Sequence, residues 1–536
     1  INRLVIQTIS RENFEFKRTM KAQSNTRIYF ALIFFALGCV LNVRAFSLLG
    51  PVQPWMQATN GVILPGDIGG PMCISNGYRW NVPVVTYGFD KSFLDYFGTN
   101  GVAAVESAIA ILNDLPPASQ IEPMNYPLNS QQVNYDAQAQ SLYDLKSETL
   151  SALLEQMGLA SPTRNVFVLR QWDPVLIYGV WYNWPDWVYP NFVALRNFDP
   201  VTFSPSYYVN NAQIGAYANT TGFENYIILF PVDPLNGGNT AVADFAQKNY
   251  SYPSYSTVLG VFFTSLTYDD VGGLAYLLST NNIAHETLLS NVAGVGTNAN
   301  AFVSGALRPG VDKITFIPQP MDLQSGTFLP TTNYFTDSYI ANGVLQHQQL
   351  ARVISQPDFI FSAGDAVSEW ADLLFFTRTG TTNWLNNAAA NGNTNGAGPG
   401  VIQPPVQIVF NKLGPLFYSG GNFSDEQALV YSWQFWGSFD GSTNQPVIYP
   451  IPQTGTNQMT VRMRLFFGTQ FQKSFTWQPE SLPGAQFEMQ TSTNLTSWVN
   501  LFTVANDGTV YTYFNDNPSS FSAFLPADST IKNSLF

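Results

Sequence analysis

The chain has 536 residues, a formal net charge of −13 and only two histidines, His285 and His347. Histidine is the usual general base near neutral pH and the commonest metal ligand, so this scarcity excludes a three-histidine zinc site. An acidic chain also repels nucleic acid and anionic lipid, so neither is an expected partner.

The first 45 residues are predicted to be a leader that does not belong to the fold. Residues 1–19 look like untranslated upstream sequence ahead of a start at Met20. A basic segment, an apolar run over residues 28–43 and the small residue Ala45 then follow the order of a secretory signal peptide. The apolar run is shorter than the roughly 20 residues that span a bilayer. We therefore expect a signal peptide over residues 20–45, a mature chain that starts at Phe46, and a secreted, cell-surface or periplasmic location without a membrane span.

The composition favours an extracellular protein that associates with itself. Charged residues make up 11% of the chain, whereas ordinary soluble domains contain roughly 25%. Low charge removes the repulsion that keeps proteins monomeric, so we expect a homo-oligomer. Cys73 is the only cysteine after residue 45, which excludes a disulfide within the mature chain and is more typical of a small buried side chain than of a reactive thiol.

Residues 46–300 are predicted to form an α+β domain. β-Branched and aromatic residues over 82–89 predict a strand. Asn100 is expected to begin the first helix, and Gly158 is expected to end the second. The helical spacing of apolar residues predicts three helices, over residues 100–112, 143–157 and 269–279.

Aromatic residues are concentrated over residues 172–208, where Trp181, Trp184 and Trp187 lie close together in the sequence. If these side chains are exposed, they can stack on sugar rings or pack against a neighbouring subunit. If they are buried, they form part of a core, which is the interpretation that we favour. The sequence leaves carbohydrate binding open as the alternative.

The chain after residue 300 is predicted to be β-rich. A middle region over residues 301–415 contains a low-complexity loop at 384–405, and a β-rich connector covers 416–474. Short strand-like runs about ten residues apart predict a small β-sandwich over 475–536. The segment Q-T-S-T-N-L-T-S-W at 490–498 resembles a signature of C-terminal sandwich modules in secreted proteins of Verrucomicrobia-like bacteria. Phrases elsewhere in the chain are similar to large secreted families of the same bacteria, which implies a secreted origin and no particular activity.

Two segments resemble parts of a matrixin-type metzincin catalytic domain. The strand that contains T-Y-G-F at 86–89, with the helix after it, is similar to that family's opening strand and helix, and L-T-Y-D-D-V-G-G-L-A-Y-L at 266–277 looks like its closing helix. The family binds zinc through two histidines one helical turn apart and a third beyond a glycine. No histidine lies between Trp80 and Leu277, and in His285-Glu286-Thr287-Leu288-Leu289 a leucine takes the second ligand position. The resemblance therefore implies a metzincin-like scaffold without zinc.

Carboxylates provide the remaining candidate sites. Asp269 and Asp270 are weak candidates for a Ca²⁺ site with Asp199 or Asp365, although adjacent acids at a helix start usually complement the helix dipole. A pair of carboxylates would suffice for glycoside hydrolysis, but no spacing selects two of them. These carboxylates are Asp114, Asp173, Asp186 and Glu224.

These features together predict a secreted, non-catalytic structural or surface protein that assembles into an oligomer or filament. The alternatives are a secreted hydrolase that acts on polysaccharide or peptide and a carbohydrate-binding protein. The sequence assigns no catalytic and no cofactor-binding residue, and we expect no zinc, while calcium stays possible.

Overall fold

The computed structural model describes the chain between residues 45 and 526, with gaps. The gaps are 57–66, 167, 170–171, 178–179, 186–192, 214–216, 221–226, 231–258, 297–298, 300, 323, 365, 369–376, 380–382, 388–398, 412–415, 419–428, 434, 450–462, 466–473, 479–485, 492–498, 506–510 and 515–523. The predicted upstream sequence and the leader before Ala45 therefore lie outside the described residues. The described residues belong to one unit, Val43–Phe536.

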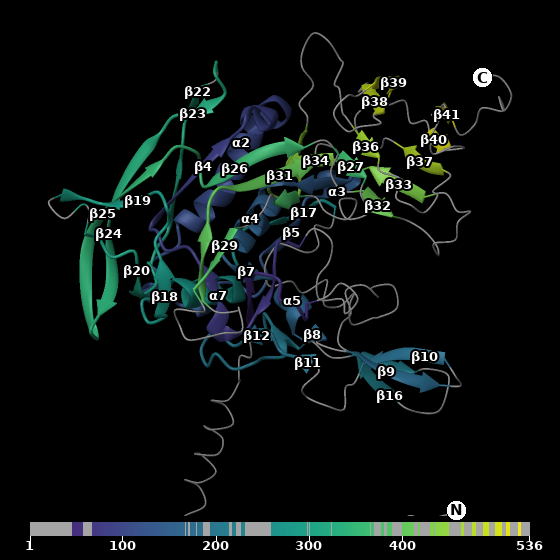
Figure 1. Cartoon of the computed structure of the whole chain (residues 1–536). Helices are drawn as coiled ribbons and strands as arrows, with labels where there is room; N and C mark the ends of the chain where they lie inside the picture. Colours follow the sequence, from purple (N-terminus) through teal and green to yellow (C-terminus); the bar gives the residue numbers. More distant parts are fainter. Residues whose placement is uncertain are drawn as a thin grey trace, which may run out of the picture. The chain divides into compact units, whose positions relative to one another are not determined.

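One five-stranded sheet, here called the central sheet, brings together strands from distant parts of the sequence (Figure 1). Four strands are parallel and the last is an antiparallel edge strand. In spatial order they are β21 (Thr315–Pro318), β4 (Val84–Phe89), β26 (Phe359–Gly364), β31 (Val406–Asn411) and β28 (Thr377–Thr379). The β-branched and aromatic residues of β4 fit this buried position, and the predicted strand over residues 82–89 is present.

Helix α2 (Lys91–Asn113) follows β4 directly. Asp90 caps it, because its side chain accepts a hydrogen bond from the Phe93 amide at 3.0 Å. Gly98, with φ of 59°, interrupts the helix and lies in a conformation that favours glycine. The predicted start at Asn100 was wrong, because the aspartate cap starts the helix before the interruption.

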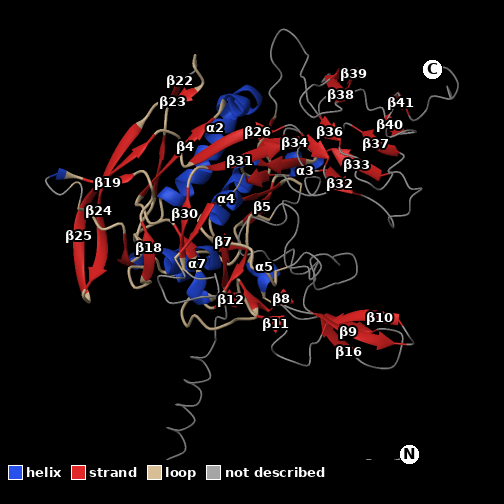
Figure 2. Cartoon of the chain, in the orientation of Figure 1, coloured by secondary structure: helices blue, strands red, loops and turns tan. Residues whose placement is uncertain are grey.

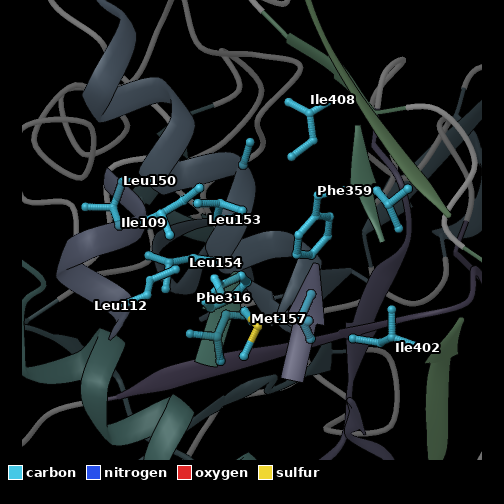
Figure 3. Packing of buried hydrophobic residues seen from close by; sticks show 14 of the residues in the cluster. Ile109, Leu112, Leu150, Leu153, Leu154, Met157, Phe316, Phe359, Ile402 and Ile408 are labelled. Atoms are coloured by element: carbon cyan, nitrogen blue, oxygen red, sulfur yellow. The ribbon is translucent and has the colours of Figure 1, made fainter. Parts of the chain in front are cut away.

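Helix α4 (Leu145–Gln156) packs beside α2, as predicted for residues 143–157 (Figures 2 and 3). Figure 3 shows Ile109 and Leu112 of α2 next to Leu150, Leu153 and Leu154 of α4. Phe316 and Phe359, from the central sheet, belong to the same buried cluster.

The end of α4 depends on a glycine, as the sequence predicts. Gly158 has a φ of 100°, and a Cβ atom there would lie 2.2 Å from the carbonyl oxygen of Tyr78. A side chain at this position is therefore opposed by both the backbone conformation and a backbone contact.

Helix α7 (Tyr268–Leu278) matches the third predicted helix. A capping box between Thr267 and Asp270 starts it. The helix contacts β1, the central strand of a small antiparallel sheet. That sheet contains β1 (Phe46–Gly50), β2 (Gly70–Met72), β7 (Leu159–Ala160) and β12 (Asn197–Phe198).

A second five-stranded sheet, here called the hairpin sheet, is antiparallel (Figure 1). In spatial order it contains β18 (Ala284–Thr287), β20 (Gly305–Arg308), β24 (Thr331–Ala341), β25 (Val344–Ile354) and β19 (Val292–Gly294). Asn342 and Gly343 join the two long strands, with φ of 52° and 74°. Asparagine followed by glycine, both with positive φ, is the preferred two-residue hairpin turn.

The C-terminal runs that the sequence predicts as strands are strands. β37 (Ser474–Gln478) and β40 (Tyr511–Phe514) lie in a sheet with β32 (Leu416–Tyr418), β33 (Leu429–Trp433) and β41 (Phe524–Pro526), and β38 (Gln486–Thr491) pairs with β39 (Val499–Ala505). This sheet takes strands from both sides of the predicted boundary at residue 475. The central sheet likewise takes strands from both sides of the predicted boundary at residue 300.

Shorter elements complete the described fold. They are β3 (Tyr78–Arg79), β5 (Gln131–Val133), α3 (Tyr135–Ala139), β6 (Leu142–Asp144), α5 (Pro162–Asn165), β8 (Val168–Leu169), β9 (Trp172–Ile177), β10 (Val180–Pro185), β11 (Val193–Ala194), β13 (Tyr208–Val209), β14 (Ala212–Gln213), β15 (Tyr217–Thr220), β16 (Ile227–Phe230), β17 (Val261–Phe263), β22 (Met321–Asp322), β23 (Thr327–Phe328), β27 (Ala366–Ser368), β29 (Asn383–Asn386), β30 (Gly400–Gln403), β34 (Phe435–Ser438), β35 (Val447–Ile448) and β36 (Met463–Leu465), with 3₁₀ turns at Ile74–Asn76, Ala118–Gln120 and Pro123–Asn125. The prediction of a mixed α+β, strand-rich fold is confirmed. Within the described ranges, no helix has the length and apolarity needed to cross a membrane.

Candidate functional site

Three buried arginine–carboxylate pairs of the described residues involve strands of the hairpin sheet. Arg79 pairs with Glu286 at 2.6 Å and Arg308 with Asp337 at 2.9 Å, while Arg352 pairs with Asp358. All six side chains are almost completely buried. Buried charges are tolerated when they are paired and their remaining hydrogen-bonding groups are satisfied, so the partners of each pair decide what it can do.

The N–H groups of Arg308 all donate hydrogen bonds to other groups of the protein. Its Nε and Nη2 atoms donate to the carboxylate of Asp337 at 2.9 to 3.2 Å. Its terminal nitrogens also donate to the backbone carbonyls of Val303, Ser304 and Glu286. All five N–H groups of the guanidinium thus have acceptors, which leaves none to bind a ligand.

Arg352 and Asp358 connect the hairpin sheet to the central sheet. Arg352 lies on β25, and Asp358 directly precedes β26. The carboxylate of Asp358 also accepts hydrogen bonds from the backbone amide and hydroxyl of Thr86 on β4, at 2.8 and 3.2 Å. This pair therefore fixes segments that are more than 250 positions apart in the chain.

The third pair leaves one carboxylate oxygen without a hydrogen bond. The Oε1 atom of Glu286 accepts from Arg79, but its buried Oε2 atom has no partner. Burial raises the pKa of Glu286, and the positive charge of Arg79 opposes that shift. Asn81, close by, also has a buried side-chain oxygen without a partner.

A cavity of about 590 Å³ lies beside these groups, where β20 and β24 share a single registered pair, Leu307 with Ile340. Its wall contains Asn81, Glu286, Arg308 and Asp337. Apolar side chains complete the wall, namely Ile283, Val311, Phe335, Ile340 and Leu345. The two unpartnered oxygens are buried from solvent, so a ligand in the cavity reaches them only if the wall moves. The cavity thus has the size of a small-molecule site, while Glu286, Arg308 and Asp337 are held in ion pairs and Asp312 accepts hydrogen bonds from Ser119.

The two acids proposed for calcium bind backbone groups. The carboxylate of Asp269 accepts the backbone amide of Ala45 at 3.1 Å and that of Asn210 at 2.5 Å. Asp270 accepts the amide and hydroxyl of Thr267, both at 2.6 Å, in the capping box of α7. Burial raises the pKa of Asp270 well above its ordinary value. In the part of the chain that the structure describes, no group of three or more His, Cys, Asp and Glu side chains could hold a metal ion.

The other candidate residues that the structure describes lie on different elements or bind local groups. Asp199 accepts from the amides of Val201 and Thr202 in a local turn, and Asp365 is outside the described residues. Trp181 and Trp184 lie on β10, paired with Leu176 and Asp173 of β9, and Trp187 is outside the described residues. Asp114 is the C-cap of α2 and Asp173 lies on β9, while Asp186 and Glu224 are outside the described residues. Cys73 is half-buried, with its Sγ atom 3.3 Å from the hydroxyl of Ser75.

Both histidines lie in the hairpin sheet, His285 on β18 and His347 on β25. The Nδ1 atom of His347 is 3.0 Å from the hydroxyl of Ser338, its partner across the hairpin. His285 pairs with Leu307 on β20. With β20 and β24 between their strands, the two side chains do not form a common site.

Sequence reasoning missed the buried arginine pairs. Arg352 and Asp337 lie at inner-face positions of β25 and β24, but apolar residues fall on both faces of these strands, so alternation alone does not mark the two charges as buried. The pairing partners cannot be read from that pattern, because Arg79 and Glu286 are 207 positions apart. No family model matches the chain, and no curated protein and no solved structure matches it either.

Proposed function

We propose that this chain is a secreted, non-catalytic structural or surface protein that associates with copies of itself. The observation that carries the proposal is the structural use of its buried carboxylates. Asp144 and Asp270 cap helices, Asp269 binds backbone amides, and Glu286, Asp337 and Asp358 are held by arginines. Catalytic acids and bases need a lone pair or proton free for substrate, whereas each of these groups has a structural partner, and the one unpartnered oxygen of Glu286 is buried from solvent.

The proposal includes a metzincin-like scaffold that has lost its zinc site. The zinc motif of that family is H-E-x-x-H-x-x-G-x-x-H, with the first two histidines on a helix. When its glycine is aligned with Gly158 at the end of α4, the three ligand positions are Ser151, Glu155 and Ser161, and Ala152 replaces the catalytic glutamate. Two serines and one glutamate are not a ligand set that zinc uses, so these residues do not fit the metal. The neighbouring α2 and α7 support the same interpretation, because they match the segments that resemble the family's first and closing helices.

The C-terminal strands support a secreted origin in the same proposal. β38 and β39 flank the segment that resembles the sandwich-module signature. A small β-sandwich built from β37 to β40 would give such a module one face for packing and a second face for contact with another chain. Calcium at Asp269 and Asp270 is not part of the proposal, since both acids already bind backbone groups.

The experiment is a combined test of chemistry and assembly on the purified chain that starts at Phe46. Elemental analysis should find no stoichiometric zinc. Unfolded peptide substrates and polysaccharide substrates should both remain uncleaved. Sedimentation velocity across a range of protein concentrations should reveal reversible association. One zinc per chain together with a chelator-sensitive peptidase activity would overturn the non-catalytic part, and a monomer at every concentration would overturn the assembly part.

A further inference from the structure

The hairpin sheet has an outer face that carries no charged side chain. In an antiparallel pair, residues directly opposite each other share a face, and successive residues alternate between faces. Asp337, Leu350 and Arg352 are buried and define the inner face. The outer face, called here the neutral face, contains His285, Thr287, Ala293, Gly305, Leu307, Thr332, Tyr334, Thr336, Ser338, Ile340, Leu345, His347, Gln349, Ala351 and Val353.

Several apolar side chains of the neutral face are exposed. Tyr334 is 72% exposed, Val353 55%, Leu345 53% and Leu307 43%. Single exposed apolar residues are ordinary, but a group on one sheet face, here beside the cavity that Ile340 and Leu345 also line, marks a contact surface. The charged residues of these strands, Glu286, Arg308, Asp337 and Arg352, point inward and are paired there.

The charge of the chain favours a second copy of the chain as the occupant of this face. Two copies of a protein with a net charge of −13 repel each other, and the repulsion is smallest where the surfaces that meet carry no charge. A basic partner would be recognised by acidic side chains, and the neutral face has none. A second copy of this chain presents the same uncharged threonine, glutamine and aliphatic side chains. It therefore meets this face with little repulsion and needs no acidic side chains to recognise it.

The size of the face is sufficient for a reversible contact. With strands about 4.8 Å apart and a rise of about 3.4 Å per residue, the five strands present a projected area of roughly 500 Å². Protruding side chains such as Tyr334 make the accessible area larger. Specific interfaces bury at least about 600 Å² per partner, so the face reaches the lower limit of that range only with its protruding side chains, as a weak, reversible contact does.

We propose that the neutral face of the hairpin sheet is the interface between two copies of this chain, related by a two-fold axis. The inference rests on the proposed self-association and assigns it to one surface. In such an isologous contact, the same residues of both copies meet, so Tyr334 and Val353 of each copy belong to the interface. The contact is made by hydrogen bonds and apolar burial and contains no ion pair.

Sedimentation velocity of the full mature chain tests the inference with matched variants. Tyr334→Glu and Val353→Glu place a carboxylate on the neutral face. Tyr135→Glu is the control. Tyr135 is 63% exposed on α3, and its replacement by glutamate adds the same charge outside the neutral face. We expect both neutral-face variants to weaken association at least about tenfold, since burying an unpaired charge costs more than that, while the control matches the wild type. Circular dichroism confirms that each variant is folded.

Ionic strength provides an independent readout. Salt screens the repulsion between acidic copies, so association of the wild type should strengthen as salt is raised, whereas a contact made by ion pairs would weaken. Wild-type association that is unaffected by Tyr334→Glu and Val353→Glu, or that weakens with salt, overturns the assignment of the face and leaves self-association intact. A wild type that never associates overturns the proposed function itself.

Discussion

Replacing Arg308 with methionine should destabilise the fold strongly, because it removes one side of a buried pair and leaves the other in place. Asp337 would keep a single hydrogen bond from Gln348 at 2.6 Å, with no positive charge beside it. The carbonyls of Val303, Ser304 and Glu286 would each lose a donor. Removing one partner of a buried ion pair costs about 3–5 kcal/mol, and each buried carbonyl left without a donor adds to that cost.

The expected loss is therefore at least about 3 kcal/mol, a large share of the roughly 5–15 kcal/mol that stabilises a folded protein. Urea unfolding, followed by far-UV circular dichroism and by the fluorescence of the chain's tryptophans, measures it through the shift in midpoint. The matched control is Lys91→Met, which removes a salt bridge of similar length, 2.7 Å, whose side chains are 76% and 61% exposed. An exposed pair contributes less than about 1 kcal/mol, so this variant should unfold close to the wild type.

A double variant separates the pair from the volume change. Arg308→Met with Asp337→Leu removes both charges, and it should recover part of the stability that Arg308→Met loses, because no uncompensated carboxylate stays buried. If Arg308→Met shifts the midpoint no more than Lys91→Met, or if the double variant is less stable than the single one, the argument from buried charge is refuted.

Three further predictions concern single positions. Burial raises the pKa of Asp144 to about 6, so the folded state holds this proton more tightly than the unfolded state, and stability falls as pH rises from about 4 through 6. Asp144→Asn keeps an acceptor for the Ser147 amide and should exceed the wild type by up to about 3 kcal/mol at pH 8 but not at pH 4, in urea titrations at both pH values. Gly158→Ala should cost more than about 2 kcal/mol in thermal unfolding, whereas Gly343→Ala, also at positive φ but with open space around it, should cost about 1 kcal/mol; equal losses would contradict the close contact with Tyr78. Thr267→Val removes the hydroxyl that binds Asp270 and should lower stability by about 1 kcal/mol, with Thr332→Val on the exposed strand as a neutral comparison.

Local patterns predicted the helices well because their signals lie within a few residues. The apolar spacing of α4 and α7 and the glycine after α4 are each sufficient to place those helices. The start of α2 was missed because Gly98 separates the capped first turns from the periodic part, so Asn100 looked like a beginning. In that case, a backbone interruption inside one element was mistaken for its boundary.

Strand partners could not be predicted in the same way. β4 pairs with β21 and β26, which lie more than 200 positions further along the chain. A run of apolar residues specifies that a strand is buried but not which strand lies beside it, because many runs of similar composition compete for that place. The same limit applies to the candidate site, where Asp269 and Asp270 had the right residue type for a metal but bind Ala45, Asn210 and Thr267.

The distribution of charge connects the stability of this fold with its proposed association. Only 11% of the residues are charged, and several of the arginines and acids are buried in pairs that fix the hairpin sheet to its surroundings. Because strand positions alternate between the two faces, the charged residues that point inward contribute no charge to the outer face. The alternation that gives Arg308, Asp337 and Arg352 to the interior therefore gives the neutral face its composition. A substitution that broke an inner pair would also disturb the outer surface, since both faces belong to the same strands, and association should be lost together with the hairpin sheet.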